Sequence, residues 1–249
     1  MKAIIIAAGP GKRLGENTYD KPKCLLKIGE KTIMETQLEA LRNNDINNIA
    51  IVRGHMKERI NFPDVKYFEN KDYLNNNILQ SLFCAKSEIN DEFVFSYSDI
   101  LYDEEIVRKL LKEKTDFSLI VDIAWKERYE GRTLHPPSEA ELVFVEDGYV
   151  TKIAKGLNSE KSHGEFIGLA FFSKRGAKIL KNVFNEVNEK FKNKRFHNAV
   201  TIEKAYLTDM IQELIDRGFK IKNIDIDGGW HEIDTPQDLE QARKQWKVN

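Results

Sequence analysis

The chain opens with a continuous apolar run that ends abruptly in glycines. Residues 2–7 read KAIIIA, and Ala8-Gly9-Pro10-Gly11 follows at once. A run that is apolar at nearly every position suits a strand buried on both faces, as in the middle of a parallel sheet. Glycines directly after such a strand let the backbone approach a ligand, and successive N–H groups there can hold phosphate oxygens. This start therefore favours a helix-covered parallel sheet with a binding loop.

The first half of the chain alternates between short apolar runs and segments with helical spacing. Such alternation predicts a mainly parallel sheet that is covered by helices. Strands are predicted at residues 2–7, 49–52, 65–68, 93–97 and 117–121, and helices at residues 32–43, 74–85 and 104–111.

The second half follows a different pattern. Residues 128–139 are rich in charge, glycine, histidine and proline, which predicts an irregular segment. Asp147-Gly148 lies between two apolar runs and is typical of a β-hairpin formed by residues 141–145 and 149–153. No linker or repeat interrupts the chain, so we expect a single domain over residues 1–249. The remaining predictions are a strand at 166–172, helices at 176–191 and 201–217, a last strand at 219–226 and a closing helix at 235–246.

The composition excludes several classes of protein. Lys plus Arg number 39 and Asp plus Glu 40, whereas a general nucleic-acid binder carries a basic excess. With 41% hydrophobic residues the chain can bury a sizeable core, so disorder is not expected. The two cysteines, Cys24 and Cys84, do not make a disulfide framework. No run approaches the ~18 apolar residues that span a bilayer, so we expect a cytoplasmic protein without membrane insertion.

The basic residues after the first strand can be compared with three phosphate-binding motifs. A P-loop needs GxxxxGK followed by Ser or Thr, but Gly9 and Gly11 are too close together and Arg13 follows Lys12. A dinucleotide-binding fingerprint needs GxGxxG, and here the third glycine, Gly15, comes one residue late. A kinase glycine loop needs further motifs that this sequence does not contain. A tight turn followed by a solvated basic loop therefore stays open as an alternative.

Three segments resemble the nucleotidyltransferase superfamily, whose members activate sugar phosphates, phosphocholine and phosphonates with nucleoside triphosphates. Residues 7–14 (AAGPGKRL) and 21–25 (KPKCL) together resemble its N-terminal signature. Residues 95–99 (FSYSD) resemble the central strand whose terminal Asp binds magnesium. Residues 229–235 (GWHEIDT) resemble the late segment that supplies a second metal-binding Asp. These matches extend over most of the chain.

The resemblance implies an α/β, Rossmann-like (GT-A-like) nucleotidyltransferase fold. This fold is a mostly parallel mixed sheet flanked by helices, with a small antiparallel β insertion in the second half. Residues 1–122 would form the nucleotide-binding half and residues 123–249 the substrate-binding half. The resemblance implies catalytic roles for Arg13 and Lys23, Mg²⁺ ligation by Asp99 and Asp234, nucleotide contacts by Ala7, Ala8, Gly9, Pro10, Gly11, Lys12, Asn76, Ser81 and Ser98, and substrate contacts by Arg128, Tyr129, Glu139, Glu165 and Trp230.

Within the superfamily the details resemble the cytidylyltransferases. Residues 75–82 resemble a stretch of the phosphocholine branch, and residues 125–141 and 165–169 resemble the phosphonate branch. The resemblance implies Mg²⁺-dependent transfer of CMP from CTP to a small phosphonate, by direct displacement and with release of pyrophosphate. The alternatives are a phosphocholine cytidylyltransferase, a sugar-1-phosphate nucleotidyltransferase and a non-catalytic nucleotide-sensing subunit. A homodimer is compatible with the same resemblance.

Several of these residues also have a purely structural interpretation. Asp99 and Asp234 could cap the helices predicted after them. Trp125, Tyr129 and Trp230 could enclose a cationic amine through their ring faces, or could simply pack in the core.

The histidines and the basic loop lead to two further expectations. His135, His163 and His231 lack metal-ligand spacing and are predicted to be polar surface or pocket residues. Arg13 and Lys23 lie on a polar loop, so they are predicted to matter for turnover more than for folding.

Overall fold

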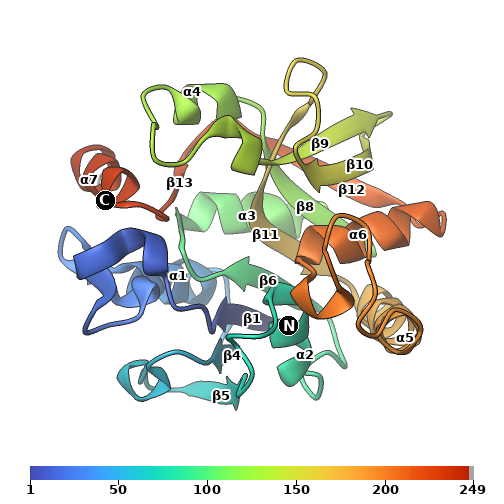
Figure 1. The fold of residues 1–249 in the computed structure, drawn as a ribbon, viewed down its shortest axis with the longest axis horizontal. Coiled ribbons are helices and arrows are strands. Elements are labelled where there is room, and N and C mark those ends of the chain that lie inside the picture. Colours follow the sequence, from blue (N-terminus) through green and yellow to red (C-terminus); the bar gives the residue numbers. More distant parts are fainter. Residues whose placement is uncertain (247–249) are drawn as a thin grey trace.

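The computed structural model describes residues 1–246, and its centre is one mixed sheet (Figure 1). In order across the sheet, the strands are β5 (Val65–Glu69), β4 (Asn48–Arg53), β1 (Lys2–Ala7), β6 (Phe93–Tyr97), β11 (Gly164–Phe172), β8 (Phe117–Asp122), β12 (Ile221–Ile226), β10 (Tyr149–Lys155) and β9 (Glu141–Glu146). β1 pairs in parallel with β4 and β6, whereas β11 runs antiparallel to both β6 and β8. The predicted mixed α/β sheet is confirmed, and both halves of the chain contribute strands to it.

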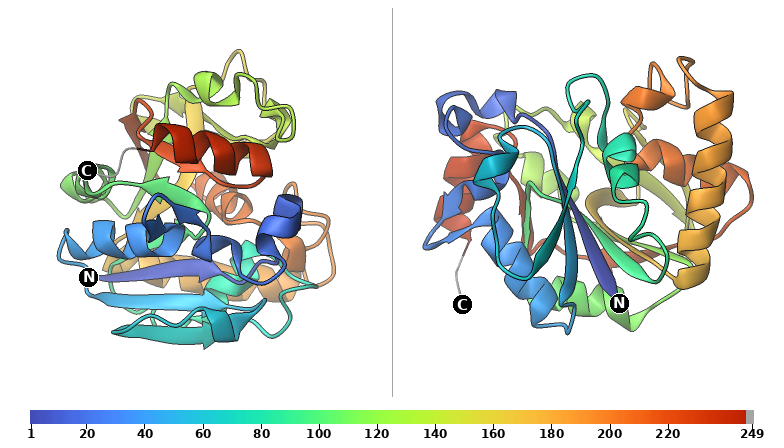
Figure 2. Two further views of the ribbon diagram at one scale, coloured as in Figure 1. Left: turned by 90° about the vertical axis from the view of Figure 1, so that its left-hand side faces the viewer. Right: turned by 90° about the horizontal axis from the view of Figure 1, so that it is seen from below.

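Helices cover both faces of this sheet (Figure 2). They are α1 (Ile33–Arg42), α2 (Ile78–Cys84), α3 (Glu104–Lys112), α4 (Trp125–Tyr129), α5 (Lys174–Lys190), α6 (Leu207–Asp216) and α7 (Pro236–Gln245). Ile4 and Ile6 of β1 belong to the hydrophobic cluster that includes α2, α5 and α6, while Ile5 belongs to the cluster that includes α1 and α3. Because β1 is covered on both faces, almost every position in it is apolar.

Two small antiparallel sheets lie outside the main sheet. One pairs β7 (Ile100–Tyr102) with β13 (Trp230–Glu232), and the other pairs β2 (Lys27–Ile28) with β3 (Lys31–Thr32). Beside the first of them, the N–H of Ile233 donates to the carbonyl of Asp99 at 2.8 Å. This pairing brings the segment that follows β6 next to the segment that precedes α7, although more than half of the sequence separates them.

Two predicted helices begin later than expected. The helix predicted at 74–85 starts at Ile78, because the Asn77 side chain accepts the N–H of Ile78 at 2.9 Å and so caps the helix there. The helix predicted at 201–217 is divided, since a short 3-10 turn comes before α6. The carboxylate of Asp209 accepts the N–H of Tyr206 at 2.8 Å, which fixes the start of α6 after that turn.

The second half contains one confirmed turn and two corrected segments. Asp147 and Gly148 both have positive φ, 50° and 77°, and form the tight turn of the predicted hairpin. Residues 128–139 are not wholly irregular, because they include the end of α4 and a 3-10 turn at Pro137–Glu139. Residues 219–226 do not hold the last strand, since β13 follows β12.

Among the residues described, no helix combines the length and the apolar character needed to cross a membrane.

Candidate active site

The loop after β1 folds back so that its cations lie beside the end of that strand. Gly11 adopts a left-handed conformation with φ 60°, and its carbonyl accepts the hydroxyl of Thr18 at 3.2 Å. A Cβ on Gly11 would lie 3.3 Å from the Cβ of Lys23, so only glycine fits without a shift of that lysine. The local turn therefore sets the position of Lys23.

Lys23 joins two carboxylates that come from distant parts of the chain. Its Nζ donates to Asp99 Oδ2 at 2.6 Å and to Asp234 Oδ1 at 2.5 Å. Arg13 Nη2 donates to the other oxygen of Asp234, also at 2.5 Å. The side chain of Lys23 is 15% exposed and that of Asp234 only 6%. These are charge-assisted contacts in a largely desolvated position, where such bonds are strongest.

The charges in this cluster shift one another's ionisation. Burial alone would raise the pKa of Asp234, but the cations of Lys23 and Arg13 outweigh it and hold that pKa well below its usual range. Burial alone would lower the pKa of Lys23, but the carboxylates of Asp99 and Asp234 raise it above its usual value. Lys23 and Asp234 are therefore both charged at neutral pH.

The structure also answers whether the two aspartates are helix caps. α3 is capped by Asp103, whose carboxylate accepts the N–H of Ile106 at 3.1 Å. α7 is capped by Thr235, which forms a capping box with Asp238. The capping interpretation of Asp99 and Asp234 is therefore wrong.

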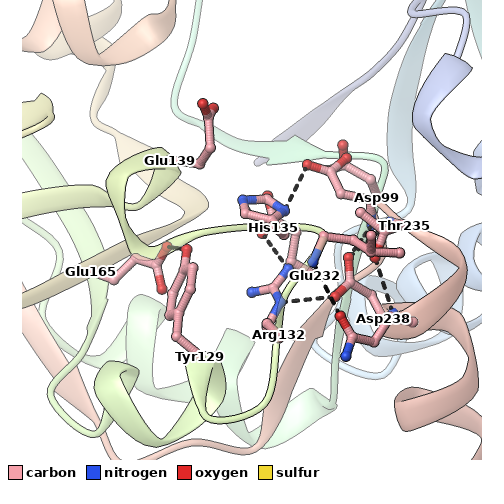
Figure 3. Close-up of polar contacts among 12 residues, drawn as sticks. Asp99, Tyr129, Arg132, His135, Glu139, Glu165, Glu232, Thr235 and Asp238 are labelled. Atoms are coloured by element: carbon pink, nitrogen blue, oxygen red, sulfur yellow. Dashed lines mark hydrogen bonds and ion pairs between the residues drawn. The ribbon is translucent and has the colours of Figure 1, made fainter.

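His135 also belongs to this cluster, although nothing in the sequence connected it with these residues (Figure 3). His135 is buried, with its Nδ1 3.5 Å from Asp234 Oδ2 and its Nε2 3.6 Å from Glu232 Oε2. Burial and the neighbouring Arg132 lower the pKa of His135 to about 4, so the ring is neutral at neutral pH. His135, Glu232 and Asp234 could together hold a metal ion. Spacing along the sequence gave no sign of this group.

The donor set can be compared with the demands of particular ions. Asp99 Oδ1 is buried and finds no hydrogen-bond partner within residues 1–246, so it retains a lone pair for a ligand. Oxygens of Asp99 and Asp234 suit Mg²⁺, which takes one or two carboxylates together with substrate phosphates. Adding the nitrogen of His135 would instead favour a transition metal. The oxygens of Asp99 and Asp234 therefore fit the magnesium ion that the resemblance implies.

The cluster lines a cavity of about 340 Å³ that contains most of the predicted site residues. Those that line it are Gly9, Pro10, Gly11, Lys12, Arg13, Lys23, Asp99, Glu139, Glu165, Trp230 and Asp234. Two further lining residues, Asn77 and Ile78, lie in the stretch 75–81 that the resemblance links with the base but were not named individually. The lining residues that were not named as site residues are Tyr97, Glu141, Lys155, Phe166, Ile167, Tyr206 and Glu232. The remaining predicted residues, Ala7, Ala8, Asn76, Ser81, Ser98, Arg128 and Tyr129, are outside its lining.

Two predicted nucleotide contacts belong to an internal hydrogen-bond network. The amide of Asn70 donates to Asn76 Oδ1 at 2.6 Å and to Ser81 Oγ at 2.8 Å. The hydroxyl of Ser81 in turn donates to the carbonyl of Asn77 at 3.1 Å. Because these bonds hold the side chains of Asn76 and Ser81 away from the cavity, Asn77 and Ile78 occupy its wall instead. Ala7, Ala8 and Ser98 are buried as well.

Of the two interpretations of the aromatic residues, core packing is confirmed for Trp125 and Tyr129. Trp125 and Tyr129 pack edge to face at 5.6 Å in a separate hydrophobic cluster. Tyr129 donates its hydroxyl to Glu165 Oε1 at 2.6 Å, and the indole of Trp230 donates to Asp122 Oδ2 at 2.7 Å. The guanidinium of Arg128 lines a second, larger cavity of about 580 Å³. Tyr129 can therefore act on a substrate only through Glu165.

Two buried carboxyl groups face the cavity and have pKa values close to neutral pH. Burial raises the pKa of Glu165 to about 8 and that of Glu141 to about 7. In the unfolded chain both would titrate near ~4.3. Between these values the folded state keeps protons that the unfolded state has released, so each group stabilises the fold less as the pH rises.

A Glu165→Gln variant should therefore gain stability relative to the wild type between pH 6.5 and pH 8. The difference in the free energy of unfolding should grow by at most ~1.4 kcal/mol per pH unit. Buried His135 and His231, whose pKa values are both lowered to about 4, are neutral in the folded state over this window. The protons that their unfolded forms still bind near pH 6.5 are the same in wild type and variant, so they cancel from the difference. Urea unfolding of both proteins at the two pH values measures the effect. A difference that does not change with pH would contradict it.

One cavity contains the glycine loop at the carboxyl end of a central strand together with two cations and two carboxylates. This is the arrangement of a nucleotidyltransferase. Residues 3–168 match the family model described as "MobA-like NTP transferase domain". The chain belongs to this family, so the resemblance found in the sequence is confirmed.

Individual relatives agree with this assignment. The chain is 34% identical to the CTP:phosphoglutamine cytidylyltransferase of Campylobacter jejuni, over 96% of this chain and 98% of the relative. It is 29% identical to the choline-phosphate cytidylyltransferase of Streptococcus pneumoniae, over 68% of this chain and 80% of the relative. A solved structure of CTP:phosphocholine cytidylyltransferase from S. pneumoniae superposes with a TM-score of 0.75, at 22% identity over 99% of both chains. That superposition supports the fold.

Proposed function

We propose that the protein transfers CMP from CTP to a small acceptor that carries a phosphate or phosphonate group, with Mg²⁺ and with release of pyrophosphate. The observation that carries this proposal is the convergence of Arg13, Lys23, Asp99 and Asp234 in one cavity. A nucleotide-sensing subunit would not need both carboxylates. The names of the two relatives support CTP as the nucleotide, since both are cytidylyltransferases.

The reaction needs no group that the site lacks. An ionised oxygen of the acceptor bonds to the α-phosphorus of CTP, while the bond from that phosphorus to the oxygen of the β-phosphate breaks and pyrophosphate departs. Because the attacking oxygen is already ionised near neutral pH, no protein base is required. Lys23 and Arg13 lie where they can neutralise charge that develops on the α-phosphate and on pyrophosphate.

Asp99 and Asp234 are the residues that would hold magnesium. When bound, the ion supplies Lewis-acid stabilisation of the phosphate oxygens. The unpartnered Oδ1 of Asp99 supports this role. The backbone of Gly9 to Gly11 would hold further phosphate oxygens through its N–H groups. We include phosphonates among the acceptors because residues 125–141 and 165–169 resemble the phosphonate branch.

Pyrophosphate release across four nucleoside triphosphates tests the proposal. Each triphosphate is paired with phosphoglutamine, phosphocholine, phosphoethanolamine, an aminoalkylphosphonate and glucose 1-phosphate, and reactions without acceptor serve as controls. We expect acceptor-dependent release that is fastest with CTP. Faster turnover with ATP or GTP would refute the cytidylyl assignment, and fastest turnover with glucose 1-phosphate would favour a sugar-1-phosphate nucleotidyltransferase. No release with any pair would refute the enzymatic function.

A further inference from the structure

One wall of the cavity is built from acidic groups that the transfer of CMP does not require. We propose that Glu165 and Glu141 bind an N–H-bearing ammonium group on the acceptor, so that the substrates are small phosphates or phosphonates carrying a primary amine. This inference rests on the proposed function. It concerns a different part of the site, since Figure 3 shows Glu165 on one side of His135 and Asp99 on the other.

Glu165 presents an oxygen for which the described residues provide no donor. Its side chain is buried, with 4% of the residue exposed, and its Oε1 accepts the hydroxyl of Tyr129 at 2.6 Å. Its Oε2 is buried without a partner within residues 1–246, yet Glu165 lines the cavity. A buried polar atom without a partner is costly, and most such atoms in native proteins are satisfied. A donor on a ligand in the cavity would satisfy this oxygen.

Glu141 lines the same cavity as Glu165, and the packing around Tyr97 fixes its position. Its Oε2 accepts the hydroxyl of Tyr97 at 3.1 Å. The ring of Tyr97 fits against Gly168, where φ is 88° and an added Cβ would lie 2.3 Å from that ring. The register of β11 shifts between Phe166 and Ala170, and such bulges commonly re-aim side chains next to active sites. The two carboxyls are thus positioned before a substrate arrives.

The charges along the cavity suit an acceptor with opposite charges at its two ends. The glycine loop contributes Lys12, Arg13 and Lys23, which attract phosphate groups. The other wall contributes the carboxyl groups of Glu139, Glu141 and Glu165, with Lys155 as a cation that pairs with Glu139 at 3.2 Å. An ammonium group placed beside Glu141 and Glu165 would favour the charged form of both carboxyls. An acceptor with an anionic phosphate and a cationic amine matches this distribution.

The same wall favours ammonium groups with N–H bonds over quaternary ones. A quaternary ammonium has no donor and is bound mainly by ring faces. Lys155 already lies over the ring of Tyr206, 4.7 Å from its centre. Trp125 and Tyr129 pack against each other in a separate cluster and do not line the cavity. Of the aromatic residues that also line it, Tyr97 packs edge to face against Phe166, and Trp230 donates its indole N–H to Asp122. Carboxyl oxygens, in contrast, accept hydrogen bonds from a primary ammonium directly.

The wild-type protein allows a first test without any substitution. With CTP, kcat/KM is measured for phosphoethanolamine, its mono- and dimethyl derivatives and phosphocholine, and for phosphoglutamine against its desamino analogue. We expect the value to fall about 10- to 100-fold from the primary amine to the quaternary one and on loss of the amino group, as for a lost charge-assisted hydrogen bond. The inference would be overturned if phosphocholine or the desamino analogue were used as well as the primary amines, or if only acceptors without an amino group were turned over. Either result would leave the cytidylyl transfer intact.

A second test replaces the carboxyl groups. Glu165→Gln keeps an oxygen for the hydroxyl of Tyr129 but cannot carry the charge, and Glu141→Gln gives an independent measurement if the first variant folds poorly. We expect KM for the amine acceptor to rise about 10- to 100-fold, with KM for CTP and for the desamino acceptor unchanged. Glu146→Gln, on the same strand as Glu141 but exposed, is the matched control. An unchanged amine KM in both variants would overturn the inference.

Discussion

Replacing Lys23 with methionine should lower kcat at least ~100-fold, in the range seen when one contact to transition-state charge is lost. Methionine keeps much of the apolar stem of the side chain but removes the cation between Asp99 and Asp234. Pyrophosphate release with CTP and the preferred acceptor measures the effect. Lys21→Met is the matched control, because Lys21 lies on the same loop, pairs with exposed Asp20 and does not line the cavity.

The same variant should also be less stable, which corrects the expectation drawn from the loop's polarity. Lys23 is not a solvated loop residue but a largely buried partner of two carboxylates. Without it, Asp99 loses the cation that it shares with Asp234, while Asp234 keeps its contacts with Arg13 and His135. We expect a loss of about 1–3 kcal/mol, below the cost of breaking a fully buried pair. Urea unfolding measures this loss. Near-normal turnover would remove Lys23 from the mechanism, and unchanged stability would contradict the buried contact.

Asp99→Asn and Asp234→Asn should each lower metal-dependent turnover at least ~100-fold. The double variant should turn over little more slowly than the slower of the two single variants. Residues that act as one unit show such non-additivity. Asparagine is close to aspartate in shape but lacks the charge that a hard cation requires. Turnover followed against Mg²⁺ concentration is the measurement.

A matched control separates the metal from the fold. Asp103 caps α3 four residues after Asp99, and Asp103→Asn should leave rate and stability nearly unchanged because asparagine caps as well as aspartate. Wild-type rates with unchanged Mg²⁺ dependence in both single variants at Asp99 and Asp234 would refute the metal assignment. Fully additive losses would instead indicate that the two carboxylates act separately.

Local pattern in the sequence was enough for the central strand, the glycine loop and the alternation of strands and helices. An apolar run such as residues 2–7 indicates a strand that is buried on both faces, and Asp147-Gly148 indicates a turn that needs positive φ. The cations Arg13 and Lys23 follow the glycine loop closely in the chain, so their place beside it in one cavity could be predicted. Asp99 and Asp234 were found by resemblance of short segments, without any knowledge of what would join them.

The direction in which a side chain points was harder to predict than the position of its residue along the chain. The run Asn75-Asn76-Asn77 offers three similar side chains, and nothing local states which one faces the cavity. The structure decides it, because Asn77 caps α2 and lines the cavity while Asn76 bonds to Asn70. A shift of one residue around a helix start changes the direction of every side chain near it.

Glu139 and Glu165 were named from the resemblance, but the places of Glu141 and His135 in the site came only from the tertiary structure. Glu141 and Glu165 lie on β9 and β11, which pair antiparallel, and the pairing of β13 with β7 brings the region of Glu232 and Asp234 beside Asp99. His135 reaches the same place from a loop about a hundred residues before Asp234. Periodicity reports whether a residue is buried, but it does not report which strands pair. Local sequence pattern therefore specifies the strands, the helices and the glycine loop, whereas long-range strand pairing determines which side chains share the cavity.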